Sequence, residues 1–326
     1  MRVSCLINGY MKRGSRSIYA ALVVAFVTAQ AISASANFDV LVSSFYTNDV
    51  LRYDSQGGGL LSEFIDDFYG GAPCDLEFGP DGNLYVAKWE FGAVDRYDGT
   101  TGMLIDRFLT SPALGNIEEL EFGPDGNLYV GASRKGEILR YDGQTGDFID
   151  VFASGGGLSC LMDLTFGPDG NLYVSDFDNN SILRYDGLTG SFLNTFASVN
   201  GLRPYGVEFG ADGNLYVSCD GLAGRGVLRF DGSSGDLMDT FITSIGGGSP
   251  IDLAFGPNGD LYVCTLTGPD QDKVERFDGQ SGAYIAQIAY GGVLNGISGI
   301  AFTPEPSTLC LFVMGGWLIL RRRWGR

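Results

Sequence analysis

Four acidic residues recur at one position of a repeated unit, and they are the side chains of this chain best placed to do chemistry. They come just before apolar strands of separate repeats, as Asp75, Glu119, Asp163 and Asp252. If these strands surround one channel, the four carboxylates face one another at its mouth. Their repulsion would favour a hard cation with oxygen ligands. The sequence therefore offers one candidate cofactor, Ca²⁺, with capping of backbone N–H groups or exposure to water as the alternative.

A second group of candidates lies in loops expected on the same face. Asp176, Asp178 and Asn179 belong to the densest cluster of oxygen donors in the chain. Trp89 offers an aromatic ring that could stack on a sugar. These four are the candidate ligand-binding residues. For the loop that contains Asp176, Asp178 and Asn179, a role in shaping the turn is favoured over ligand binding. For Trp89, packing at an exposed edge is as plausible as stacking on a sugar.

Several catalytic classes are excluded by what the chain lacks. It contains no histidine, which removes Ser-His-Asp and Cys-His catalysis and histidine-ligated metals. It also lacks a Gly-x-Ser-x-Gly elbow and a phosphate-binding loop. No catalytic residue is assigned, and an enzyme on this scaffold would have to use carboxylates and a bound cation.

The elements that must position these residues are repeated hairpins. One pattern, first seen as Leu-Glu-Phe-Gly-Pro-Asp-Gly-Asn-Leu-Tyr-Val, occupies residues 76–86, 120–130, 164–174, 207–217 and 253–263. Pro80, Asp81 and Gly82 suit successive positions of a tight turn, with a positive φ at the glycine.

A second hairpin, with Tyr/Phe-Asp at its core, follows each first one. Its aromatic residue is Tyr53, Tyr97, Tyr141, Tyr185, Phe230 or Phe277, and subtraction gives steps of 44, 44, 44, 45 and 47 residues. A period of about 40–50 residues with four β segments is typical of propeller blades. The pattern predicts an all-β, six-bladed β-propeller with four-stranded antiparallel blades.

The ends of the repeat predict how the ring closes. Residues 300–304 restart the pattern and then stop, while residues 38–43 lack a hairpin before them. Pairing of 300–302 with 38–43 would let the C-terminal strand join the N-terminal blade and leave no open edge.

An arginine recurs at one position of every blade. Because a catalytic arginine would normally occur in one blade alone, we expect these six to pair with turn aspartates or to lie across neighbouring blades. They are Arg52, Arg96, Arg140, Arg184, Arg229 and Arg276.

The charge of the repeat region limits its partners. Eight of the 21 Lys and Arg residues lie in the two ends of the chain, which leaves 13 in residues 37–304. Of the 39 acidic residues, only Glu305 lies outside this region, so its net charge is 13 − 38 = −25. Nucleic acid is therefore not expected as a partner, because phosphate binding needs clustered cations.

Both ends read as targeting segments. At residues 1–36, basic residues precede an apolar run, and Ala34-Ser35-Ala36 offers a cleavage site, so we expect a signal peptide that starts at Met1 or Met11. Such export permits disulfides. Of the four cysteines in the ring, Cys219 and Cys264 could approach each other, with free thiols favoured for at least one pair.

The other end, residues 304–326, joins Pro304-Glu305-Pro306 to the mostly apolar residues 307–320 and then Arg321-Arg322-Arg323. It resembles the PEP-CTERM sorting tail of Gram-negative bacteria. The resemblance implies transient anchoring of 307–320 in the inner membrane and processing by an exosortase-type enzyme. The protein would then belong to the cell envelope or to an extracellular exopolysaccharide matrix.

Over residues 38–303 the Phe-Gly-Pro-Asp-Gly-Asn-Leu-Tyr-Val units resemble NHL and gluconolactonase-like six-bladed propellers. Residues 37–303 would form this domain. Near-identical blades favour a non-enzymatic binding or scaffold role, with a matrix polysaccharide or an envelope protein as partner. The alternative is a calcium-dependent, lactonase-like hydrolase that uses the four acids at the channel mouth.

Overall fold

The computed structural model describes residues 38–66, 70–110, 116–132, 135–221, 224–243, 245–268 and 271–304. The predicted signal peptide, and all of the predicted tail except Pro304, lie outside these ranges. Within the ranges, no helix has the length and apolar character needed to cross a membrane.

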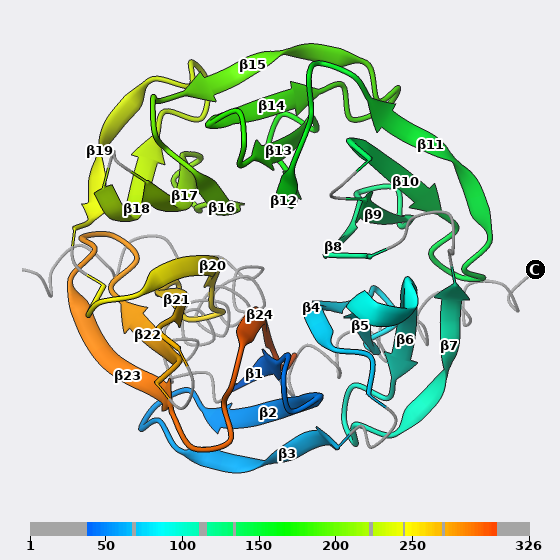
Figure 1. The fold of residues 1–326 in the computed structure, drawn as a ribbon, viewed down its shortest axis with the longest axis vertical. Helices are drawn as coiled ribbons and strands as arrows, with labels where there is room; N and C mark the ends of the chain where they lie inside the picture. Colours follow the sequence, from blue (N-terminus) through cyan, green and yellow to red (C-terminus); the bar gives the residue numbers. More distant parts are fainter. Residues whose placement is uncertain are drawn as a thin grey trace, which may run out of the picture. The chain divides into compact units, whose positions relative to one another are not determined.

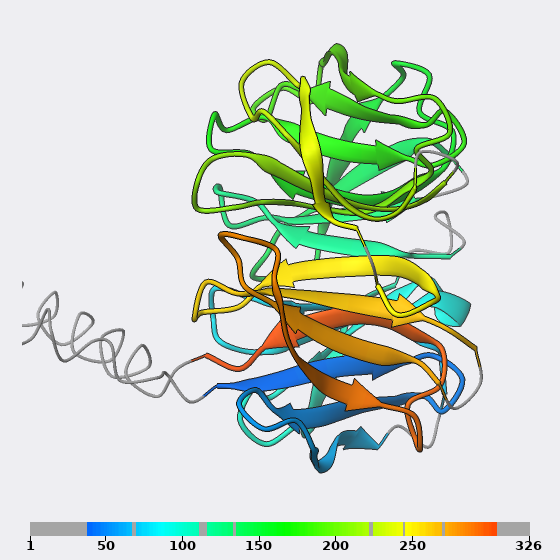
Figure 2. The same ribbon diagram turned by 90° about the vertical axis from the view of Figure 1, so that its left-hand side faces the viewer.

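Six four-stranded antiparallel sheets form a ring, as predicted, and each sheet is one blade (Figure 1; seen from the side in Figure 2). From the innermost strand outward, blade 1 is β24 (Ile297–Phe302), β1 (Asp39–Ser44), β2 (Asp49–Asp54) and β3 (Leu60–Asp66). Blade 2 is β4 (Pro73–Phe78), β5 (Leu84–Lys88), β6 (Ala93–Tyr97) and β7 (Leu104–Thr110), with the short 3-10 helix η1 (Trp89–Phe91) between β5 and β6. Blade 3 is β8 (Glu119–Phe122), β9 (Leu128–Ala132), β10 (Glu137–Tyr141) and β11 (Phe148–Ser154).

The other three blades follow the same order. Blade 4 is β12 (Leu161–Phe166), β13 (Leu172–Asp176), β14 (Ser181–Tyr185) and β15 (Phe192–Ser198). Blade 5 is β16 (Pro204–Phe209), β17 (Leu215–Gly221), β18 (Gly224–Phe230) and β19 (Leu237–Ile242). Blade 6 is β20 (Ser249–Phe255), β21 (Leu261–Leu266), β22 (Lys273–Phe277) and β23 (Tyr284–Tyr290).

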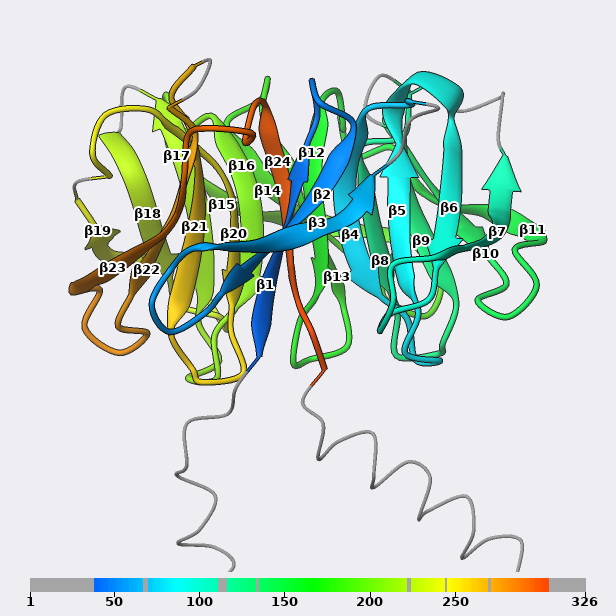
Figure 3. The ribbon, with the colours of Figure 1, turned by 90° about the horizontal axis from the view of Figure 1, so that it is seen from below.

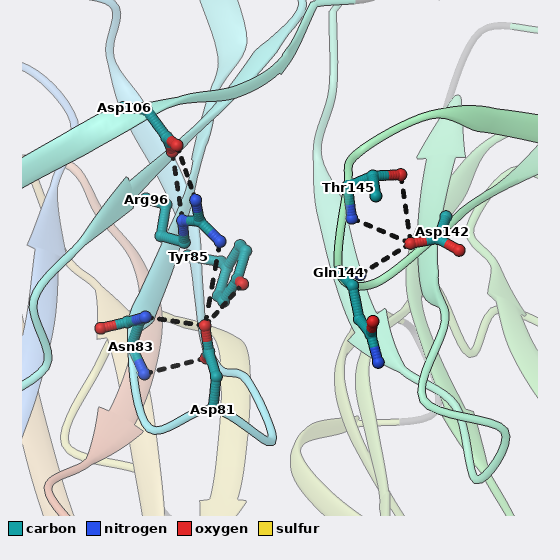
Figure 4. A network of polar contacts seen from close by, with 8 residues as sticks. All are labelled: Asp81, Asn83, Tyr85, Arg96, Asp106, Asp142, Gln144 and Thr145. Atoms are coloured by element: carbon teal, nitrogen blue, oxygen red, sulfur yellow. Dashed lines mark hydrogen bonds and ion pairs between the residues drawn. The ribbon is translucent and has the colours of Figure 1, made fainter.

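The turn of the first hairpin is fixed by an aspartate in blades 2 to 5 and by Asn258 in blade 6. In blade 2, Asp81 Oδ1 accepts the Asn83 backbone N–H at 3.0 Å, and its Oδ2 accepts the Asn83 side-chain amide at 2.7 Å (Figure 4). Gly82 has a φ of 80°, as the turn requires. Because Asp81 is fully engaged by its own turn, it shapes the hairpin and leaves little for a ligand.

A tyrosine on the second strand of blades 2 to 6 joins each blade to the next. Tyr85 packs edge-on against Phe108 of its own outer strand, at 4.9 Å between ring centroids, and against Phe122 of blade 3, also at 4.9 Å. Its hydroxyl contacts Asp81 Oδ2 at 3.2 Å. The same arrangement recurs at Tyr129, Tyr173 and Tyr216. In blade 6, Tyr262 keeps the contact with the next blade, at 4.9 Å from Phe302, but its hydroxyl contacts the Asn258 side chain. Each of the tyrosines in blades 2 to 5 therefore connects the hairpin turn of its blade, the outer strand of the same blade and the inner strand of the next blade.

The recurring arginines are structural, as expected. Arg96 forms a two-point ion pair with Asp106 at 2.6 and 3.1 Å and lies 3.9 Å from Asp81 (Figure 4). Its guanidinium group also covers the Phe108 ring, 5.1 Å from the ring centroid. Blade 4 differs because Asn194 stands where blade 2 has Asp106. There the Nε of Arg184 is buried without a hydrogen-bond partner among the described residues.

Successive blades also contact each other through the turn of the second hairpin. Asp142 holds this turn by accepting the backbone N–H groups of Gln144 and Thr145 at 2.9 and 2.8 Å (Figure 4). The glycine that follows, Gly146, has a φ of 75°, and a Cβ there would lie 2.2 Å from the Phe108 carbonyl of the preceding blade. Glycine is therefore required by both the turn and the close approach.

The ring closes as the sequence predicts. Val40 pairs with Phe302, Leu41 with Ala301 and Val42 with Ile300. The first and last described strands therefore share blade 1, and both β1 and β24 have their free ends on the face that carries the hairpin turns (Figure 3).

A buried aspartate from blade 6 secures this closure. Asp272 Oδ2 accepts the backbone N–H groups of Gly296 and Ile297, at 2.7 and 3.2 Å, where the chain enters β24. Its Oδ1 accepts those of Thr267 and Gly268, at 2.8 and 3.0 Å. One carboxylate therefore ties the β21–β22 loop to the strand that closes the ring.

Replacing this carboxylate should loosen the ring. We expect Asp272→Ala to lower the free energy of unfolding by about 3 kcal/mol, because buried backbone donors lose a charged acceptor. Denaturant unfolding followed by circular dichroism measures this loss. Asp178→Ala, at an exposed loop position, is the matched control and should change stability little; equal effects of the two substitutions would contradict the assigned role.

Candidate functional site

Three of the four acids predicted at the channel mouth connect neighbouring blades. Asp75 accepts its own strand's Leu76 N–H through Oδ1 at 2.7 Å and, through Oδ2, the Leu120 N–H of the next blade at 2.8 Å. Asp163 and Asp252 repeat both contacts, with Val207 N–H at 2.6 Å and Ile300 N–H at 3.1 Å as the cross-blade donors. The structure therefore places these acids within the innermost strands, where the sequence had indicated positions just before them, and shows that their carboxylates bridge blades.

We call the equivalent positions of these acids on the six innermost strands the first tier. Its other three positions are occupied differently. The carboxylate of Glu119, at the start of β8, makes no hydrogen bond among the described residues. In blades 5 and 1 the position is glycine. A Cβ on Gly206 would lie 3.0 Å from Leu253 N, and one on Gly299 would lie 2.9 Å from Asp75 Cα. The backbone approaches the next blade too closely there for a fifth or sixth acid.

A second tier of acids lies two residues further along the innermost strands and was not expected from the sequence. It consists of Glu77, Glu121 and Glu208, which alternate with buried apolar residues and so face the same side as the first tier. Glu121 accepts Phe166 N–H at 3.3 Å, and Glu208 accepts Phe255 N–H at 2.7 Å. The alternation Asp-Leu-Glu-Phe at 75–78 was the available signal.

Burial dominates the electrostatics of both tiers. It raises the pKa of Asp75 to about 6, that of Glu208 to about 7 and that of Glu121 to about 8. Burial, and then the charges of neighbouring acids, also raise the pKa values of Glu77 and Glu119 well above the usual range. The acids retain some exposed surface because they border the channel, but protein surrounds them, so their charged forms are poorly solvated.

The calcium site stays a prediction. Within the described ranges, no three acidic or cysteine side chains lie close enough together to hold one metal ion. Three of the four proposed ligands already accept two backbone hydrogen bonds each. Calcium would have to compete with these contacts or draw the acids inward.

The predicted ligand loop is held by its own side chains. Asp176 is buried at the end of β13 and accepts hydrogen bonds from Ser159 N–H, Ser159 Oγ and Cys160 N–H at 3.1 to 3.2 Å. Asn179 donates to Asp176 Oδ2 at 2.7 Å and to the Gly157 carbonyl at 2.8 Å. The favoured structural role is confirmed for these two residues, while Asp178 is exposed. Ligand binding at the three residues is untested.

Trp89 is partly buried in the structure. It lies in η1 on the face opposite the hairpin turns, and its ring packs edge-on against Phe45 at 5.7 Å. This supports the packing role and leaves the sugar-stacking role as a prediction. The four ring cysteines are free, which confirms the expectation of free thiols.

The outer surface carries a feature that was not anticipated from the sequence. Every outer strand begins with two adjacent, exposed apolar residues, which we call the apolar rim. The rim consists of Leu60, Leu61, Leu104, Ile105, Phe148, Ile149, Phe192, Leu193, Leu237, Met238, Tyr284 and Ile285, each 39–60% exposed. Since adjacent strand residues point to opposite faces, both sides of each strand are uncovered at this point. The available signal was the apolar pair that follows each second turn.

Comparisons with known proteins identify the fold alone. No protein-family model matches the chain, and no curated protein matches it. Among solved structures, a protein of unknown function from Bacteroides caccae is 18% identical with a TM-score of 0.64, covering 82% of this chain and 100% of that one. A chain of a nidogen/laminin complex is 15% identical with a TM-score of 0.65, covering 82% and 99%. The virginiamycin B lyase of Staphylococcus aureus is 16% identical with a TM-score of 0.59, covering 84% and 93%.

The buried acids make a pH-dependent stability testable. A carboxyl group whose pKa is raised by folding stabilises the protein in its protonated form. That contribution is complete below the pKa of the unfolded chain and is lost as the pH rises through the folded value. For Glu121 this window runs from the ordinary value of 4.5 to about 8.

We therefore expect Glu121→Gln to raise the melting temperature at pH 8 by about 2–4 °C. The change should be small at pH 5, because glutamine keeps the acceptor for Phe166 N–H without the buried charge. Calorimetry from pH 5 to pH 8 measures the difference. Glu63→Gln, at an exposed position of β3, is the control and should leave the pH profile unchanged. A Glu121→Gln profile parallel to that of the unaltered protein would contradict the electrostatic assignment.

Proposed function

We propose that this protein is an exported, non-enzymatic scaffold of the cell envelope or extracellular matrix, which binds protein partners along its apolar rim. The observation that carries the proposal is the recurrence of the rim in all six blades. Exposed apolar residues on edge strands promote association with other chains, and soluble proteins usually avoid them. Because exposed apolar pairs increase the risk of aggregation and yet occur in all six blades, we infer that they form a binding surface.

The composition of the rim supports this reading. Its residue types differ from blade to blade, from Leu60-Leu61 in blade 1 to Tyr284-Ile285 in blade 6, while their apolar character is constant. By contrast, the third residue of the outer strands is serine, aspartate, asparagine or alanine. The outer strand is also the last strand of each sheet, so one backbone edge is unpaired among the described residues. A partner strand could pair with this edge and cover the apolar side chains.

The candidate catalytic groups argue for binding over catalysis. Asp75, Asp163 and Asp252 hold blades together, and Asp176 holds a loop. A catalytically inactive virginiamycin B lyase carries a histidine-to-alanine substitution, and the present chain has no histidine. The nidogen/laminin complex shows a similar propeller fold within a protein assembly.

Export is inferred from the two ends of the sequence. The apolar run after Lys12, Arg13 and Arg16 supports a signal peptide, and the Pro304-Glu305-Pro306 tail supports transient anchoring and processing by an exosortase-type enzyme. The strong negative charge of the ring suits a solvated surface and argues against nucleic-acid partners. A matrix polysaccharide or an envelope protein is the partner class that fits these features.

Retention of the protein in the envelope or matrix tests this proposal. The full chain is produced in a Gram-negative host that has an exosortase, and the envelope, matrix and medium fractions are compared by immunoblot. We expect the unaltered protein in the envelope or matrix, and a combined Leu104→Thr and Ile105→Thr variant to be released several-fold more into the medium. Leu188→Thr is the control because Leu188 is 87% exposed but lies outside the rim. Unchanged retention of the rim variant would contradict the proposal.

The alternative function, a calcium-dependent lactonase-like hydrolase, has its own test. Titration calorimetry with Ca²⁺ should show tight binding that Asp163→Asn abolishes, together with lactone hydrolysis that depends on the metal. We expect neither, because Asp163 already bridges blades 4 and 5. Binding at micromolar Ca²⁺ with hydrolysis would replace the scaffold proposal.

A further inference from the structure

A cavity opens at the seam between blades 6 and 1, where the ring closes. Its volume is about 480 Å³, within the usual range for small-molecule sites. The cavity is lined by the turn between β2 and β3 and by the chain that ends and follows β23. The lining residues are Tyr53, Gly57, Gly58, Gly59, Leu60, Gln287, Ile288, Ala289, Tyr290, Gly291, Gly292 and Val293.

Substitutions in the repeat create this space. In blade 2 the corresponding turn carries Thr101 and Met103, and Met103 is 70% exposed. Blade 1 has the same turn length but places Gly57 and Gly59 at these two positions. The loss of two side chains leaves bare backbone along one wall. Gly291 and Gly292 provide a second stretch of bare backbone opposite it.

A buried hydroxyl without a partner reaches this cavity. Tyr53 is 4% exposed, and its hydroxyl makes no hydrogen bond among the described residues. The hydroxyl is not among the polar atoms sealed from solvent without a partner, so it contacts the open space. In blade 4 the equivalent Tyr185 donates to the Gly155 carbonyl at 2.9 Å. The Tyr53 hydroxyl is therefore open to an occupant at the blade junction that has the cavity, whereas the Tyr185 hydroxyl is engaged within the protein.

The lining defines the chemistry of the occupant. In a ring with a charge of −25, none of the lining residues is charged, which favours a neutral ligand over an ion. The exposed rings and chains of Tyr290 and Val293 offer apolar contact, while the glycine backbone and the Tyr53 hydroxyl offer hydrogen bonds. A sugar ring combines an apolar C–H face with a rim of hydroxyl groups.

We propose that the seam cavity binds a neutral oligosaccharide, with the Tyr53 hydroxyl as a hydrogen-bonding group and Tyr290 as an apolar contact. This proposal rests on the proposed function for its setting in a polysaccharide matrix. It goes further by naming the class of ligand and the site that binds it. The site shares only Leu60 with the apolar rim, and neither Tyr53 nor Tyr290 belongs to the rim, so substitutions at the tyrosines test the site without altering the rim.

The test uses the purified full-length chain and two tyrosine variants. A glycan array holding neutral and uronic-acid oligosaccharides is screened first, and the neutral glycan with the strongest signal is titrated by calorimetry. We expect saturable binding of neutral glycans, weaker binding of uronic-acid ones, and about five- to tenfold lower affinity in Tyr53→Phe. Tyr53→Phe keeps the ring shape, and it removes no hydrogen bond within the protein, so its melting temperature should not fall.

Tyr185→Phe is the matched control. It should lower the melting temperature because the Gly155 carbonyl loses a donor, but glycan affinity should be unchanged. The proposal is overturned if no neutral glycan binds, if uronic-acid glycans bind equally well, or if Tyr53→Phe binds as tightly as the unaltered protein. Loss of glycan binding with normal matrix retention would separate this site from the rim-based scaffold function.

Discussion

The structure depends on one contact, the edge-on packing of a hairpin tyrosine between two phenylalanines. Tyr85 packs against an outer-strand ring of its own blade and an inner-strand ring of the next, while its hydroxyl contacts the turn aspartate. Hydrophobic burial alone would allow many angles between neighbouring sheets. Offset or edge-on aromatic packing with a fixed hydroxyl allows few, which makes each blade repeat the orientation of the last. Four such steps, in blades 2 to 5, and the contact of Tyr262 with Phe302 set the angle at five of the six blade junctions.

Because this contact involves the same repeat positions in blades 2 to 5, the sequence was sufficient to predict the fold. The turn residues, the arginines and the closing strand all act within one repeat or between adjacent repeats. Their recurrence at fixed repeat positions was therefore enough to predict their structural role. Blade 1 is the exception that the closure explains: Leu41 occupies the tyrosine position, and Phe38 and Phe302 instead pack against Tyr262 of blade 6.

The site could be predicted only in part, because its chemistry depends on distances between blades. The spacing of Asp75, Asp163 and Asp252 showed that they occupy equivalent repeat positions, but it placed them just before the innermost strands, whereas they lie within those strands. It could not show that each carboxylate lies within 3.1 Å of a backbone donor in the following blade. The same limit hid Asp272, whose partners at 296 and 297 become neighbours when the ring closes. The seam cavity escaped prediction for the same reason.

The distribution of polar and apolar groups in the ring argues that its function lies at the periphery. The acids of the interior are committed to the framework, and their raised pKa values show that their charge has a cost there. At the outer edge the situation is reversed, since about half of the surface of each rim side chain is exposed to solvent. Phe148, Phe192 and Tyr284 pack against buried rings of their own blades, but the exposed half of each rim residue contributes nothing to the core. Partners that cover the rim would recover the hydrophobic free energy that folding leaves unused.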